Sequence, residues 1–190
     1  MLLVVAGALA IPLAASCAGG LRILSPRIQC PSERTRCQDQ LRQLGGAFVG
    51  HGAQRGASDL PGGAAAFLEL VAEFAIPPER LLCPGDSSPV AAGHSVSAVD
   101  RHDAAALRAV CSYAVRDFTR YPLDPNSTRP QIIAADADVH HRDGLNVLWD
   151  DGSVQFLDRM YLNLAPDEPI VVGPDSPHPE LRKLCIVPER

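Results

Sequence analysis

Apolar and polar positions alternate most regularly on either side of Asp151-Gly152. An Asp-Gly pair favours a two-residue type I′ turn, because both central residues of that turn need a positive φ. With such a loop, the apolar residues of both strands fall on one face, and Asn146 and Gln155 lie on the other. The pattern therefore predicts a β-hairpin over about 144–158. Its predicted buried face consists of Leu145, Val147, Trp149, Val154 and Phe156.

Helical spacing of apolar residues predicts two earlier helices. The first covers about 32–50, with Ser32 as its cap and Cys37, Leu41, Leu44 and Phe48 on its buried side. The second covers 64–76 and ends at the following Pro-Pro pair, which cannot continue a helix.

The rest of the chain predicts short elements joined by many loops, since it contains 15 Gly and 17 Pro. A helical turn is expected at 103–110, with strands at 111–115 and 131–135. We therefore predict an α+β fold, in which an N-terminal helix packs on a small antiparallel β-sheet. A single domain over 25–190 would follow an apolar segment at 1–24.

The uncharged apolar run at residues 1–17 has three interpretations. It resembles a secretory signal without a basic start, a lipoprotein signal ending at Cys17, or the first helix of a pilin whose basic leader precedes Met1 or has been lost. All three place the domain outside the cytoplasm. The several arginines that follow the run would favour a cytoplasmic tail by the positive-inside tendency, and a basic leader would remove that conflict.

Composition narrows the classes of function. The chain of 190 residues has 46% hydrophobic residues, enough for a core, and a net charge of −5, which argues against a nucleic-acid surface. Its six Cys contain no C-x2-C pair, so their spacing does not indicate a zinc site. Disulfides are compatible with export, but fifteen pairings fit six cysteines and the sequence selects none.

One polar cluster suggests metal chemistry. Asp136, Asp138 and His140 would share one face of an extended segment, with His141 on the opposite face. Two carboxylates and an imidazole are ligands for a divalent cation, although the imidazole does not suit calcium. The alternative is an ordinary polar strand end at the surface. We expect no cofactor other than such a cation.

The sequence gives less support for a catalytic site than for a metal site. His141 and Asp151 would lie up to ~30 Å apart along an extended strand, so we expect Asp151 to be fixed in the turn and His141 to anchor the open end of the hairpin. Cys83 lies in a Cys-Pro-Gly-Asp turn with no evident activating base. The chain lacks G-x-S-x-G, a phosphate-binding glycine loop and H-E-x-x-H. The sequence therefore predicts a protein that is not an enzyme.

Several segments together resemble one family. His141, nine residues, then Asp151 and Gly152 resembles the H-x9-D-G motif of type IV pilin-like (pseudopilin-like) proteins common in planctomycetes. The segment R-T-R-C-Q-D-Q-L-R-Q-L-G at 34–45 resembles the end of their pilin helix, and the turn at 83–86 resembles their C-P-x-D turn. The family's leader cleavage site and the Glu five residues into its mature helix have no counterpart here.

The resemblance implies a non-enzymatic structural subunit of a type II secretion or pilus-like assembly. Such a subunit spans the inner membrane once, and its C-terminal domain is periplasmic or extracellular. Its partners would be other pilin-like subunits or the secretion machinery, and the membrane itself through the N-terminal segment. Two alternatives remain: a secreted or lipid-anchored binding module that no longer polymerises, and a metal-dependent hydrolase using Asp136, Asp138 and His140.

Overall fold

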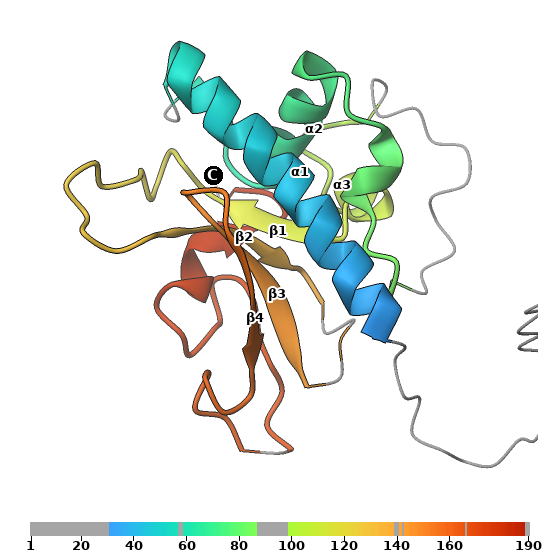
Figure 1. Ribbon diagram of the computed structural model, residues 1–190, viewed down its shortest axis with the longest axis vertical. Helices are drawn as coiled ribbons and strands as arrows, with labels where there is room; N and C mark the ends of the chain where they lie inside the picture. Colours follow the sequence, from blue (N-terminus) through green and yellow to red (C-terminus); the bar gives the residue numbers. More distant parts are fainter. Residues whose placement is uncertain are drawn as a thin grey trace, which may run out of the picture.

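A computed structural model describes residues 31–56, 59–86, 99–138, 141, 143–165 and 167–188. A long first helix lies diagonally across a five-stranded antiparallel sheet of order β4-β3-β2-β1-β5, as Figure 1 shows. Two shorter helices lie beside it (Figure 1). The helices are α1 (Pro31–Arg55), α2 (Ala64–Glu73), η2 (Pro78–Leu81), α3 (Ala104–Val110) and η4 (Leu181–Lys183), and the strands are β1 (Tyr113–Arg116), β2 (Ile132–Asp136), β3 (Gly144–Trp149), β4 (Val154–Asp158) and β5 (Leu184–Cys185).

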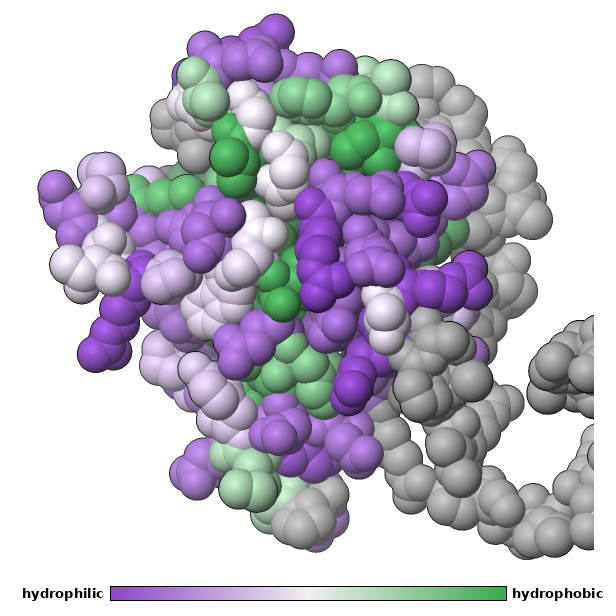
Figure 2. All heavy atoms as spheres, viewed as in Figure 1, coloured by the Kyte–Doolittle hydropathy of each residue, from purple (hydrophilic) through white to green (hydrophobic). Residues whose placement is uncertain are grey.

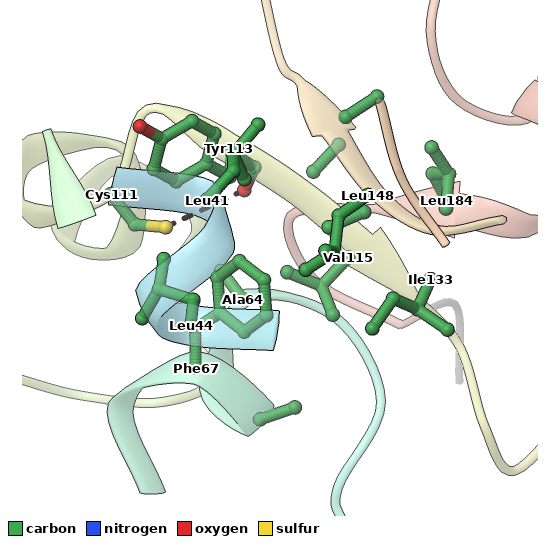
Figure 3. Close-up of a cluster of buried hydrophobic side chains, with 14 of the residues drawn as sticks. Leu41, Leu44, Ala64, Phe67, Cys111, Tyr113, Val115, Ile133, Leu148 and Leu184 are labelled. Carbon is green, nitrogen blue, oxygen red and sulfur yellow. Dashed lines mark hydrogen bonds between the residues drawn. The ribbon is translucent and has the colours of Figure 1, made fainter. Parts of the chain in front are cut away.

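One hydrophobic core joins these elements. Figure 3 shows Leu41 and Leu44 of α1 and Phe67 of α2 facing side chains of the sheet strands. The solvent side of α1 is polar, with exposed Arg36 and Arg42, and Figure 2 shows mainly hydrophilic atoms along it. The predicted α+β arrangement, a helix packed on an antiparallel sheet, is therefore confirmed.

The predicted elements are present, with different ends. The first helix is longer than the predicted 32–50, because the glycines near its end do not interrupt it. The second begins as predicted at Ala64 but ends at Glu73. Asp103 caps α3, with its side chain accepting hydrogen bonds from Ala105 N and Ala106 N. The apolar segment at 1–24 and the side chain of Ser32 lie outside the described residues, and within the described part no helix is long and apolar enough to cross a membrane.

The hairpin exists, but its loop is longer than predicted. Trp149 N donates to Ser153 O at 2.9 Å, so three residues, 150–152, form the loop. Gly152 has φ 81°, whereas Asp151 is not among the residues with positive φ. The connection is therefore a three-residue hairpin loop with glycine in the left-handed position, and the predicted type I′ turn is wrong.

The longer loop shifts the strand register by one residue, which redistributes the predicted buried face. Leu148 pairs with Val154 and Asn146 with Phe156, so these four residues share one face. Leu145, Val147 and Trp149 lie on the opposite face with Gln155. Both faces of β3 are covered, because Asn146 and Leu148 are as fully buried as Leu145 and Val147. The prediction of a hairpin with one buried face is thus wrong for β3.

The face carrying Leu148 touches α1 at a glycine. A Cβ atom on Gly45 would lie 2.6 Å from Leu148 Cδ1 and 3.2 Å from Gly152 O. Real Cβ atoms essentially never approach another heavy atom as closely as the first of these distances. Nearer the start of α1, the Arg34 guanidinium lies 4.7 Å from the centre of the Phe156 ring. The helix therefore follows the hairpin along its length, and the absence of a side chain at Gly45 permits the closest approach.

Replacement of Gly45 by Ala should destabilise the fold by ~1–3 kcal/mol, because the added methyl group overpacks the contact with Leu148 and the backbone at Gly152. Gly46→Ala is the matched control, since nothing lies within 4 Å of its Cβ position. That variant should gain up to ~1 kcal/mol from helix propensity. Urea unfolding of the two variants and the wild type measures both changes; equal effects would contradict the close contact.

Candidate functional site

Four side chains with ligand-type atoms converge inside the domain: Cys37, Cys83, Asp136 and His141. One donor atom from each lies within 4.8 Å of the donor atoms of the other three. All four residues are buried, with between 0% and 2% of their surface exposed. Cys37 and Asp136 are separated by 99 positions in the sequence, so only the tertiary fold brings the cluster together.

The contacts within this cluster form a chain. Cys37 Sγ donates to Asp136 Oδ1 at 3.2 Å. His141 Nε2 lies 3.7 Å from Asp136 Oδ2 and 3.5 Å from Cys83 Sγ. The Tyr113 hydroxyl approaches Cys37 Sγ at 3.5 Å and donates to Gln40 Oε1 at 3.2 Å. The cluster thus connects α1, β1, β2 and the segments that carry Cys83 and His141.

Two of the groups are positioned by elements on the helical side. Cys37 precedes Leu41 by one helical turn, so the face of α1 that enters the core carries the thiol to the sheet. Cys83 begins a turn in which Asp86 N donates to Cys83 O at 2.9 Å. Ser112 Oγ donates to Asp86 Oδ2 at 2.7 Å and fixes this turn against the start of β1.

The other two groups come from the sheet. Asp136 is the last residue of β2, and its Oδ2 accepts hydrogen bonds from Asn146 N at 2.7 Å and Asn146 Nδ2 at 3.1 Å. His141 precedes β3 and forms an isolated bridge with Gly144. The His141 Nδ1 atom is buried and has no hydrogen-bond partner among the described residues. The carboxylate is therefore held on one side and leaves Oδ1 facing Cys37.

Burial and mutual contact shift the pKa values of all four groups. The hydrogen bond with Cys37 lowers the pKa of Cys83, and the same contact, together with burial, raises the pKa of Cys37. Burial raises the pKa of Asp136 to about 6, and the nearby Cys83 adds to that rise. Burial alone would lower the pKa of His141, but its hydrogen bond to Cys83 and the charge of Asp136 raise it overall. The shifts of Cys37 and Asp136 thus favour their neutral forms, whereas those of Cys83 and His141 favour their charged forms.

The predicted site residues are divided between different places. Asp136 belongs to the buried cluster, whereas Asp138 is exposed and pairs with Arg108 at 2.9 Å. His140 lies outside the described residues. The idea that Asp136 and Asp138 share one ligand face is wrong, because β2 ends at Asp136 and the chain then leaves the extended conformation.

His141 lies at the open end of the hairpin, as expected, and contacts Asp136 rather than Asp151. Asp151 is exposed in the loop at the other end, where its Oδ1 accepts from Ser153 N at 2.9 Å. The motif residues His141, Asp151 and Gly152 therefore mark the two ends of the hairpin and do not form one site.

Sequence reasoning missed the two thiols of the cluster. It assigned Cys37 only to a helix face and found no activating base for Cys83, yet His141 lies 3.5 Å from Cys83 Sγ. The absence of a C-x2-C pair excluded only zinc sites in which two cysteine ligands lie close together in the sequence. No spacing along the sequence signals a cluster whose four members come from separate segments of the chain.

A separate feature is an open hollow of ≈ 720 Å³ on the sheet face opposite α1. Half-buried Trp149 and exposed Tyr161 contribute aromatic surface to it, and Arg129, Glu180 and Lys183 contribute charge. It lacks the enclosure of a small-molecule site, but its aromatic side chains and arginine are residue types enriched at protein-contact surfaces.

No protein-family profile matches the chain, and neither a curated protein nor a solved structure is significantly similar to it.

Replacement of Asn146 by Ala should destabilise the fold by ~1–3 kcal/mol, because the buried Asp136 carboxylate loses a side-chain donor that water cannot replace. Gln155→Ala, an exposed change on the neighbouring strand, is the control and should stay within ~0.5 kcal/mol of the wild type. Urea unfolding at neutral pH measures both. Equal stability of the two variants would show that Asn146 does not support the carboxylate.

Proposed function

We propose that this chain is a non-enzymatic, pilin-like structural subunit, anchored in the inner membrane by its N-terminal apolar segment. The domain over 31–188 is then exposed on the periplasmic or extracellular side and joins a type II secretion or pilus-like assembly. The observation that carries the proposal is the long helix α1 lying across an antiparallel sheet and contacting the hairpin closely at Gly45.

Three further observations support this proposal. The helix α1 begins only a few residues after the apolar segment in the sequence, as an anchored helix requires. The solvent side of α1 carries exposed Arg36 and Arg42, so the helix presents a polar surface to neighbouring subunits. The buried polar cluster exposes at most 2% of any of its residues, so a substrate would find no access to Cys83 or His141.

The second candidate function is an exported binding module. The open hollow beside Trp149 and Tyr161 favours it, because aromatic side chains and arginine, here Arg129, are enriched at protein-contact surfaces. A module of this kind would use the sheet face opposite α1, whereas an assembling subunit would use the exposed side of α1. The two functions therefore predict different contact surfaces.

Site-specific photocrosslinking separates the two candidates. The gene, expressed from its own locus with a C-terminal tag, would carry the photoreactive residue at Arg36 on α1 or at Tyr161 on the opposite side. A structural subunit should be recovered with the inner membrane, with its tag accessible to protease once the outer membrane has been permeabilised. Crosslinks between copies of the chain should form from position 36 and be rare from 161. In the proposed assembly, the copies would contact one another through α1 and not through the opposite side of the domain.

Two results would contradict the structural role. A chain found soluble outside the cell, with crosslinks to another protein from position 161 and none between copies, would support the binding module. A tag protected from protease in cells whose outer membrane has been permeabilised would place the domain in the cytoplasm and exclude both candidates.

A further inference from the structure

We infer that Cys37, Cys83, Asp136 and His141 bind one zinc ion in a closed structural centre. The inference concerns how the domain is held together, and it does not depend on the structural-subunit role. It rests on the distances, burial and donor types of the four groups.

The distances agree with a tetrahedral zinc site. Zn–S bonds of ~2.3 Å and Zn–N or Zn–O bonds of ~2.1 Å place the ligand atoms of a tetrahedron ~3.4–3.8 Å apart. Cys37 Sγ lies 3.2 Å from Asp136 Oδ1, and His141 Nε2 lies 3.5 Å from Cys83 Sγ. No pair exceeds 4.8 Å, so shifts of a few tenths of an ångström to about an ångström complete the coordination.

The donor set selects the metal. Two thiolates, an imidazole and a carboxylate are the ligands that zinc takes in proteins, whereas calcium and magnesium require oxygen donors. Four protein ligands with almost no exposed surface leave no open position for water or substrate. Full coordination by the protein is the mark of a structural zinc site, as opposed to a catalytic one.

Charge and the surrounding hydrogen bonds favour the same assignment. Zn²⁺ binds the two cysteines as thiolates, His141 as a neutral imidazole and Asp136 as a carboxylate, so any protons that these groups carry are released to solvent. The ion then offsets two of the three negative charges from two thiolates and one carboxylate. Asn146 already holds Asp136 Oδ2 with two hydrogen bonds, which leaves Oδ1 directed toward Cys37. Such outer hydrogen bonds orient metal ligands and are typical of protein zinc sites.

A disulfide between Cys37 and Cys83 is the competing chemistry in an exported protein. A disulfide would use only the two sulfur atoms and would leave the buried Asp136 carboxylate with Asn146 and His141 as its polar neighbours. The convergence of all four donors is accounted for by a metal and not by a disulfide. The two outcomes differ in metal content and in the mass of the intact chain.

The direct test measures metal in the full chain, purified in detergent with reductant and without oxygen. Inductively coupled plasma mass spectrometry should find one zinc per chain in the wild type. Cys37→Ser and His141→Ala should each lose stoichiometric zinc. Cys111→Ser should retain it, because Cys111 is a buried thiol outside the cluster and donates to Tyr113 O. Asn146→Ala should weaken zinc binding roughly 10- to 100-fold.

A spectroscopic measurement on the wild type keeps the test independent of whether the variants fold. Replacement of zinc by Co²⁺ should give the intense visible absorption of tetrahedral cobalt together with a near-ultraviolet sulfur-to-cobalt charge-transfer band. Wild-type chain with free thiols but no bound zinc or cobalt would overturn the inference. So would an intact mass, measured without reductant on chain isolated from its native compartment, that shows a Cys37–Cys83 disulfide.

Discussion

The structure depends on the contact between α1 and the β3–β4 hairpin. At Gly45 the helix lies so near Leu148 and the backbone of Gly152 that a Cβ atom would force its neighbours to shift. Two turns earlier, Cys37 on the same side of the helix meets the open end of the hairpin through Asp136 and His141. These positions are eight residues, or ~12 Å, apart along α1. The helix is therefore fixed against both ends of one hairpin.

This double attachment explains the burial of so many polar groups in a small domain. Asp136, His141 and Asn146 are nearly inaccessible, and each is placed by the junction of the helix with the sheet. A buried carboxylate is costly unless hydrogen bonds or a cation compensate it. Asn146 supplies the hydrogen bonds, and the proposed zinc ion supplies the cation. Packing at one end of the hairpin and polar contacts at the other thus have complementary roles.

The sequence predicted what local periodicity determines. The helices near 32–50 and 64–76, the short helix before β1 and the hairpin around 151–152 were all found, because each has apolar spacing or turn chemistry of its own. The strand register of the hairpin was not predicted correctly. Asp-Gly fits a three-residue loop as well as a two-residue loop, and β3 buries apolar side chains on both faces, so its pattern does not select one register. The four-residue cluster was beyond reach, because Cys37 and Asp136 are 99 positions apart and no local spacing connects them.

A double-mutant cycle between Gly45→Ala and Leu148→Ala tests the central contact most directly. Leu148→Ala removes the atom nearest to the Cβ position at residue 45, so the added methyl group should cost less in that background. The coupling free energy from urea unfolding should be at least ~1 kcal/mol, with the sign that Leu148→Ala offsets Gly45→Ala. Additive effects of the two changes would show that α1 does not rest on the hairpin as described, and would contradict the account.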